Sequence, residues 1–282
     1  MSLILPPWYF ANETDNITAA ATATQVTLGA SNADGSAVTL LSALAHDVHF
    51  LIITMQANAS QFGANPCSLL DILQDPAGGT SWASFIDDLL FNGSGPGVST
   101  NNGYTYGFAF PVYIKAGTSL GMQGRTAHSS TRVINVRCWA LGNPSRPELW
   151  WCGSHVETVG ATPAGSRGTN VTPGTSSGFG SWTNIGSTIS GAWGAAQVGC
   201  GSENSTSMKD QYNFLEMGYG SNKLPGSPRF FVGGNASEQG TLWPHARPWW
   251  CDIPVGTQMQ ARMASSLGSS PDVMQIAIYG VY

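Results

Sequence analysis

The chain contains one stretch twice, as Ile114-Lys-Ala-Gly-Thr-Ser-Leu120 and as Ile253-Pro-Val-Gly-Thr-Gln-Met259. Each copy is followed by a short motif, Gln123-Gly-Arg125 or Gln260-Ala-Arg262, and then by a strand-like segment that ends in glycine. Similarity that recurs at a fixed distance along a chain is typical of a repeated structural unit. We therefore expect an internal duplication.

The similarity continues upstream in both copies. Thr24–Gly29 aligns with Thr169–Gly174, and Leu70–Ile72 aligns with Leu215–Met217, without a net gap between the two matches. The sequence therefore divides into an N-terminal arm, a first repeat, a connector and a second repeat, with boundaries at 1–19, 20–142, 143–164 and 165–282.

Each repeat has the pattern of β-strands. Residues 49–55 form a β-branched and aromatic run of strand length. In residues 133–141 and 273–279 the apolar side chains alternate, which predicts one buried face per strand, in the same phase in both copies. Ser84–Phe91 is the best candidate for a short helix. Short strands between Gly, Asn, Ser and Pro-rich turns predict an all-β chain of two tandem antiparallel β-sandwiches of the jelly-roll kind.

The composition excludes some classes of function. Only 10% of the residues are charged, compared with about 25% in an average soluble domain, which favours a surface covered by neighbours. A net charge of −5 with 11 Lys and Arg residues gives no basic stripe, so we expect no nucleic-acid partner. We also expect no membrane insertion, because no apolar run reaches the roughly 18–20 residues required. The start has no signal-peptide pattern, which predicts synthesis in a cytoplasm.

The residues give no support for a metal, a cofactor or a catalytic centre. Five cysteines without a CxxC spacing predict buried free thiols. Gly117-Thr-Ser-Leu-Gly121 matches the G-x-S-x-G nucleophile motif, but it lies between two expected strands and Gln258 takes the place of the serine in the second copy, so we interpret it as a turn. In His46-Asp-Val-His49 a strand would place the two histidines on opposite faces. We expect a protein that is not an enzyme.

One charged pattern occurs in both repeats: an early acid, Asp71 or Glu216, and a late arginine, Arg125 or Arg262. A carboxylate and a guanidinium can form two parallel hydrogen bonds. We therefore expect each pair to form a partly buried bidentate bridge that fixes the register of two strands.

Aromatic residues gather in the arm, in the connector and near the second copy of the repeated stretch. Large rings can fill the seam between two sandwiches, which we favour, and they can also anchor a subunit interface or stack on sugars. The candidates are Trp8, Tyr9, Trp150, Trp151, Trp249 and Trp250.

Several of these strings together resemble virion structural proteins of tailed bacteriophages: Leu70-Asp-Ile72, the two repeated stretches, the Gln-x-Arg motifs, and Ala277-Ile-Tyr-Gly280. The sequence departs from that pattern at Leu73, where a glycine would stand, and at Lys115, where a proline would stand. The resemblance implies a virion surface component, either associated with the tail or fibre or decorating the head. It also implies a homo-oligomer, with a trimer as one candidate, that contacts other virion proteins.

A binding function of another class is the alternative. The tryptophan clusters could serve a carbohydrate-binding adhesin or lectin-like module, with a host-surface glycan as its partner. A polysaccharide-degrading enzyme would require two carboxylates roughly 5–9.5 Å apart in a cleft. Asp87 and Asp88 are adjacent in the sequence and are poor candidates for that role.

Overall fold

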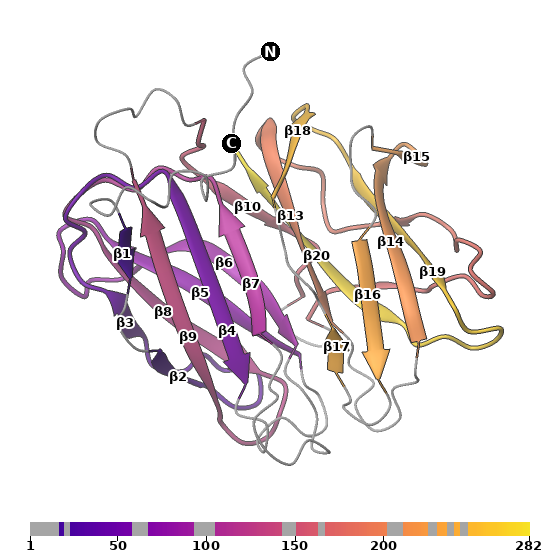
Figure 1. Ribbon diagram of the computed structural model, residues 1–282, viewed down its shortest axis with the longest axis horizontal. Helices are drawn as coiled ribbons and strands as arrows, with labels where there is room; N and C mark the ends of the chain where they lie inside the picture. The colour runs from indigo at the N-terminus through magenta and orange to yellow at the C-terminus, as the bar shows by residue number, and fades with distance from the viewer. Residues whose placement is uncertain are drawn as a thin grey trace.

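The computed structural model describes residues 17–19, 23–57, 67–92, 105–142, 151–162, 167–201, 211–224, 230–235, 240–242 and 248–282. Within these residues the protein is all-β, as predicted, with its strands in four antiparallel sheets (Figure 1). The described part of the chain contains no helix, and so none that could span a membrane.

The first half of the chain forms two sheets. Sheet A has the order β1-β9-β4-β7, with β2 also paired to β9; its strands are β1 (Ile17–Ala19), β2 (Thr24–Leu28), β4 (Phe50–Ala57), β7 (Thr105–Phe110) and β9 (Arg132–Leu141). Sheet B has the order β3-β8-β5-β6; its strands are β3 (Val38–Leu41), β5 (Cys67–Asp75), β6 (Ala83–Asn92) and β8 (Ser119–Thr126).

The second half forms the other two sheets. Sheet C has the order β10-β20-β13-β18, with β11 also paired to β20; its strands are β10 (Val156–Val159), β11 (Thr169–Val171), β13 (Trp193–Gly201), β18 (Trp249–Ile253) and β20 (Met274–Val281). Sheet D has the order β12-β19-β14-β16-β17, with β15 paired to β14; its strands are β12 (Thr183–Asn184), β14 (Gln211–Tyr219), β15 (Asn222–Lys223), β16 (Phe230–Asn235), β17 (Gly240–Leu242) and β19 (Met259–Ser265).

The two halves share one strand order. Strands β2, β9, β4 and β7 of sheet A are arranged as β11, β20, β13 and β18 of sheet C. Strands β3, β8, β5 and β6 of sheet B are arranged as β12, β19, β14 and β16 of sheet D. We call the first half module 1 (β1–β9) and the second half module 2 (β10–β20). The origin of this likeness in a gene duplication stays a prediction.

The sequence-based boundaries differ from the sheets at two places. Strand β1 falls within the expected N-terminal arm but pairs with the end of β9. Strand β10 falls within the expected connector but pairs with the end of β20. Both segments therefore extend a sheet of the module that follows them in the sequence.

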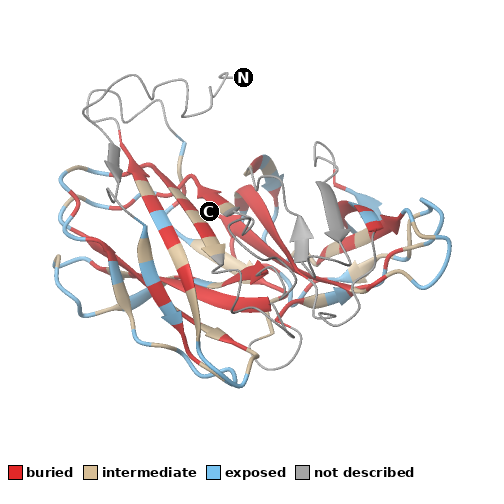
Figure 2. Cartoon of the chain, turned by 60° about the horizontal axis from the view of Figure 1, so that its bottom comes forward, coloured by how far each residue is buried: buried red, intermediate tan, exposed pale blue. Residues whose placement is uncertain are grey.

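The predicted alternation is confirmed in the last strand of each module. The side chains of Ile134, Val136, Cys138 and Ala140 on β9 are buried, as are those of Met274, Ile276 and Ile278 on β20. Strand β20 is buried on its other face as well, along its whole length. In Figure 2 the strands where the two halves meet are coloured as buried. A β-strand buried on both faces has a second layer packed against it, and here that layer is module 1.

The expected helix over Ser84–Phe91 is wrong, because this segment is part of strand β6. Ile86, Leu89 and Leu90 are all fully buried, and their spacing is that of one helical face. The register of β6 against β5 explains Ile86 and Leu89, while Leu90 lies on the other face and is buried against β13 of module 2. Leu89 pairs with Leu70 and Ile86 pairs with Ile72, so β6 carries one extra residue in a β-bulge that shifts the alternation.

The seam between the modules is built around Tyr279 of β20. Its hydroxyl accepts a hydrogen bond from the Leu90 amide at 2.6 Å and donates one to the Asp88 carbonyl at 3.1 Å. Its ring meets the rings of Phe108 and Phe110 edge-on, with centroids 5.4 and 6.1 Å away. Tyr279 of module 2 thus enters the side of the module 1 sandwich, and one apolar core runs through both modules.

Small residues let the two modules approach. A Cβ atom on Gly199 would lie 3.1 Å from the Cβ of Leu90, and one on Gly201 would lie 2.6 Å from the Sγ of Cys67. Larger side chains at these two positions of β13 would push module 1 away. The backbone contributes as well, because the Ala109 amide donates to Gln197 Oε1 at 3.0 Å.

Candidate functional site

Arg125 of β8 lies among three carboxylates at the surface of sheet B. Its Nη1 donates a hydrogen bond to Asp34 Oδ1 at 2.9 Å, and its Nη2 donates one to Asp88 Oδ1. The nearest oxygen of Asp71 is 4.0 Å from Nη2. Asp71 and Arg125 are therefore close enough to form an ion pair, but the bidentate bridge that the sequence predicted between them is absent.

Asp71 takes its hydrogen bonds elsewhere. It accepts one from the Asp88 amide at 2.9 Å and one from Gln123 Nε2 at 3.3 Å. Burial raises the pKa of Asp71 above its ordinary value, and these two hydrogen bonds and the charge of Arg125 only partly oppose that effect. Asp88 itself has a φ of 56°, in the left-handed region, at the bulge of β6. The bulge thus turns the Asp88 amide toward Asp71.

In module 2 the predicted acid and arginine are hydrogen-bonded. Nε and Nη2 of Arg262 both donate to Oε2 of Glu216, at 3.0 and 2.8 Å. The guanidinium also lies over the rings of Phe179 and Trp182, 4.7 and 4.5 Å from their centroids. Glu216 is buried, and Lys223 Nζ is 4.0 Å from its other oxygen. Both donors reach one oxygen, so the geometry is forked rather than two parallel bonds.

The two arginines do not occupy equivalent positions, which corrects the sequence alignment. The Gly29 amide donates to the carbonyl of Gly124, and the Gly174 amide donates to the carbonyl of Met263. Gly124 is thus equivalent to Met263, and Gln123 rather than Arg125 is equivalent to Arg262. The likeness of the two Gln-x-Arg motifs shifted the alignment by two residues.

The other polar motifs keep local structural roles. Gly117 has a φ of 87° in the turn before β8, and Ser119 is buried in that strand. Asp47 Oδ1 accepts a hydrogen bond from the Ala116 amide at 2.7 Å. His49 is buried edge-on to Tyr113, and burial lowers the pKa of this histidine. Among the described residues no three His, Cys, Asp or Glu side chains could hold a metal ion.

All five cysteines are free thiols. Cys67, Cys138 and Cys200 are buried as predicted, while Cys152 and Cys251 are partly exposed. Burial raises the pKa of Cys138 and of Cys251 to about 12.

The tryptophans differ from the expectation that they fill the seam. Trp249 is buried within module 2, whereas Trp151 and Trp250 are 39% and 41% exposed. These two exposed rings form an edge-on pair with centroids 5.5 Å apart. The seam is filled by Tyr279 and its neighbours instead. Trp8, Tyr9 and Trp150 lie outside the described residues.

The outer face of sheet A carries an apolar cluster that is separate from the main core. Phe50, Ala109 and Leu141 are buried there, and the partly exposed side chains of Ile52 and Trp139 pack against them. We call these five residues the outer cluster. The alternation of β9 predicts its inward-facing residues but not this outward-facing cluster. The signal was present, since Trp139 and Leu141 stand at positions where a solvent-facing strand would carry polar residues.

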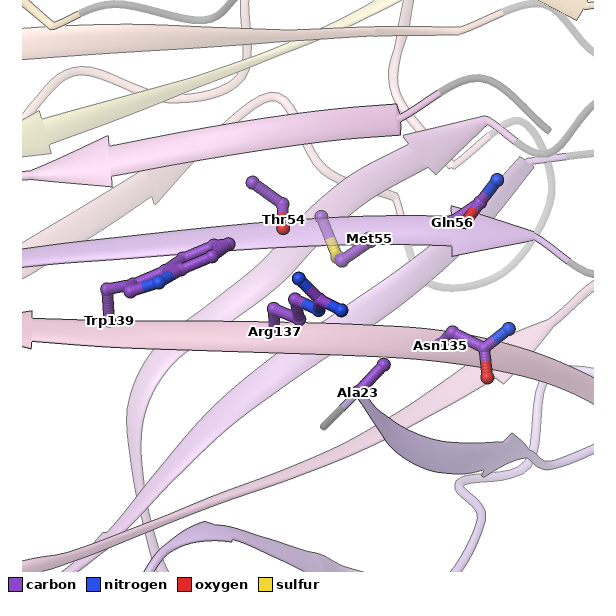
Figure 3. Close-up of a pocket in the computed structure, with 7 residues that line it drawn as sticks. All are labelled: Ala23, Thr54, Met55, Gln56, Asn135, Arg137 and Trp139. Carbon is purple, nitrogen blue, oxygen red and sulfur yellow. The ribbon is translucent and has the colours of Figure 1, made fainter. Parts of the chain in front are cut away.

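A hollow lies beside the outer cluster. It has a volume of about 420 Å³, and Figure 3 shows Trp139, Arg137 and Asn135 in succession along β9, with Thr54, Met55 and Gln56 on the neighbouring strand β4. A second hollow of about 310 Å³ is lined by Ile52, Thr54, Trp139 and Leu141. The face thus combines an apolar half with a polar half around the exposed Arg137.

The equivalent face of sheet C is covered. Gln197, Tyr279 and Ala277 stand where sheet A has Ile52, Trp139 and Arg137, and all three are buried against module 1. One face of the fold is therefore covered in module 2 and partly open in module 1. This arrangement suits binding of another protein surface, because apolar faces of this kind mark interaction sites.

Comparisons with known proteins give remote likenesses only. No protein-family model matches the sequence, and no curated protein matches it. The PBSX exported protein XepA is 11% identical, with 94% of this chain and 86% of that chain covered and a TM-score of 0.25. A structure from Sulfolobus Turreted Icosahedral Virus is 7% identical, with coverages of 95% and 90% and a TM-score of 0.39.

A tandem-domain structure gives a likeness of the same order. The CBM22-1-CBM22-2 tandem domain of Xyn10C from Paenibacillus barcinonensis is 8% identical, with 95% and 94% of the chains covered and a TM-score of 0.24. Because these TM-scores are below 0.5, none of the three likenesses carries an argument about function.

Proposed function

We propose that this chain is a structural component of a bacteriophage virion, located on the particle surface at the tail, at a fibre or on the head, where it acts by protein assembly rather than by catalysis. The observation that carries the proposal is the outer face of sheet A. This face holds an apolar cluster with partly exposed Ile52 and Trp139, whereas its equivalent in sheet C is covered by a neighbouring module.

Two features of the sequence support the same proposal. Only 10% of the residues are charged, which suits a protein whose surface is shared with neighbours. The strings around Leu70–Ile72, the repeated stretches and Ala277–Gly280 resemble virion structural proteins of tailed phages.

The test is to locate the chain on purified particles. An antibody raised against the purified chain is applied to gradient-purified, salt-washed particles and detected by immunogold electron microscopy. We expect gold at one fixed place on each particle, which would also separate a head from a tail location. Particles that lack the chain by both gold labelling and mass spectrometry would disprove the proposal.

The exposed pair Trp151 and Trp250 favours glycan binding as a second candidate. Aromatic rings at a surface can stack on sugars, and these two rings are in contact and exposed. A glycan array probed with the wild type and with Trp151→Ala and Trp250→Ala tests it. Binding by the wild type that both variants lose would support this candidate. Trp249→Ala is unsuitable as a probe because Trp249 is buried.

A further inference from the structure

Trp139 of sheet A holds the position that Tyr279 holds in sheet C. In register, Trp139 pairs with Ile52 of β4, and Tyr279 pairs with Gln197 of β13. Strands β9 and β20, and likewise β4 and β13, have the same places in their sheets. The side chain that joins module 2 to module 1 thus has a partly exposed aromatic counterpart in module 1.

Tyr279 acts by entering the open side of a sandwich. Strand β7 is the last strand of sheet A, and β6 is the last strand of sheet B. The ring of Tyr279 reaches Phe108 of β7, and its hydroxyl bonds the amide of Leu90 of β6. An unpaired strand edge is a place where another chain can attach, and module 2 covers this edge within the same chain.

Module 2 has a comparable side. Strand β18 is the last strand of sheet C, and β16 holds the place of β6 in sheet D. Phe231 pairs with Phe214 as Leu90 pairs with Leu69, so Phe231 is the counterpart of the residue that bonds Tyr279.

We infer that the outer face of sheet A binds module 2 of a second copy of this chain, with Trp139 meeting strand β18 at the edge of sheet C as Tyr279 meets strand β7 at the edge of sheet A. This inference rests on the proposed function, because it names the partner in assembly. The contact is head-to-tail: each copy offers sheet A to one neighbour and the side of module 2 to another. Contacts of this type close into rings or continue as filaments.

Two further observations support a second copy as the occupant. The outer cluster includes Ala109, whose amide already bonds Gln197 of module 2, so the open face is continuous with the established seam. A partly exposed tryptophan surrounded by apolar residues is also the residue type that dominates binding energy in protein interfaces.

The new interface differs from the seam in one respect. Thr54 and Gln56 stand where sheet C has Gly199 and Gly201, so the second copy lies farther from β4 than module 1 lies from β13. The hollow of about 420 Å³ beside Arg137 leaves room for a side chain of that copy.

The first test measures the mass of the purified full-length chain by light scattering and sedimentation over a range of concentrations. We expect a multiple of 29.6 kDa for the wild type. Trp139→Ala should weaken self-association about 10-fold or more, and Thr54→Arg, which places a charge in the hollow without removing apolar contacts, should do the same. Tyr219→Ala serves as the control, since it removes an exposed aromatic ring from β14, which is not an edge strand of its sheet.

The second test identifies the occupant. A photoreactive benzoyl-phenylalanine replaces Trp139, and the variant is mixed with isotopically labelled wild type before cross-linking and mass spectrometry. Cross-links to residues 211–253 of the labelled copy support the inference. Cross-links to sheet A of the other copy, cross-links to residues 1–16 of either copy, or a wild type that stays monomeric would overturn it.

The virion role and the contact between copies can be disproved independently of each other. Gold labelling of particles combined with cross-links elsewhere leaves the virion role standing and removes this interface. Cross-links to module 2 in a chain that is absent from particles would do the reverse.

Discussion

Arg262 combines an ion pair with the buried Glu216 and packing against two aromatic rings. Its guanidinium donates two hydrogen bonds to Glu216 Oε2 and lies over two aromatic rings. Arg262→Met would leave the Glu216 carboxylate, which is 1% exposed, without its main partner. We expect a loss of about 3 kcal/mol in the free energy of unfolding, the lower end of the cost of breaking a buried pair, measured by chemical denaturation.

Two companion variants separate charge from packing. Lys223→Met removes the other, more exposed cation near Glu216 and should cost less than about 1 kcal/mol. The double variant Arg262→Met with Glu216→Leu should recover part of the loss, because no charge then remains buried. A double variant that is less stable than Arg262→Met would contradict this account of Glu216.

Asp71 gives a prediction about pH. Its pKa is raised by burial, so the folded state holds its proton more tightly than the unfolded state does. The charged carboxylate therefore costs stability at neutral pH, and the cost disappears as the pH falls through the raised pKa. The melting temperature of the wild type minus that of Asp71→Asn should accordingly rise between pH 7 and pH 4.

The asparagine variant is a close mimic, because its side-chain oxygen can still accept the hydrogen bond from the Asp88 amide. Asp252→Asn, which changes an exposed carboxylate, is the control. A wild-type advantage that shrinks on acidification would mean that the ion pair with Arg125, rather than burial, dominates at Asp71.

At the scale of the strand, one glycine marks how tightly sheet C is packed. A Cβ on Gly280 of β20 would lie 1.8 Å from two ring atoms of Trp193. Trp193 is buried and held by a hydrogen bond from its Nε1 to Glu157 Oε2 at 2.9 Å, so the ring has little room to move. Gly280→Ala should therefore cost about 1–3 kcal/mol, measured by thermal unfolding.

The chain offers a matched control on another strand. A Cβ on Gly107 of β7 would first meet Thr54 Cγ2 at 3.7 Å, an ordinary contact. Gly107→Ala should leave the melting temperature nearly unchanged. Ala140 holds the place of Gly280 in sheet A, and Val48 stands there where sheet C has Trp193. Equal losses from both substitutions would indicate a general cost of alanine in these strands.

The strands show which features a sequence can reveal. The inward alternation of β9 and β20 depends on neighbours two residues apart, and it was predicted. The bulge of β6 depends on a hydrogen bond from the Asp88 amide to Asp71, which is 17 residues away in the sequence. Such a contact cannot be seen in a local pattern, so the short helix expected over Ser84–Phe91 was wrong.

The candidate site was harder to predict than the strands for the same physical reason. Whether an outward-facing strand residue meets water or protein depends on which sheets pack together. In the sequence, Gly199 and Gly201 of β13 reflect that packing, since they allow module 1 to approach β13. Aligning the two Gln-x-Arg motifs also gave a register two residues away from the one that the backbone hydrogen bonds of Gly124 and Met263 define.

At the scale of the whole molecule, we expect the seam to make the two sandwiches unfold as one cooperative unit. A single apolar core passes through both modules, and Tyr279 contributes its ring and two hydrogen bonds to the other module. Domains joined by a large apolar interface unfold together, whereas weakly joined domains unfold separately. We expect one calorimetric transition for the wild type.

Substitutions at Tyr279 should dissect that unit. Tyr279→Phe keeps the ring but leaves the Leu90 amide and the Asp88 carbonyl without their partner, which should cost about 1–3 kcal/mol while the single transition persists. Tyr279→Ala also removes the contacts with Phe108 and Phe110, and the transition should split in two. Tyr219→Ala, at an exposed tyrosine of β14, is the control. A single unshifted transition in Tyr279→Ala would show that the modules are held together by their covalent connection and the remaining contacts. The same result would weaken the case for Trp139 as an anchor between copies, because Trp139 is assigned there the role that Tyr279 has within one chain.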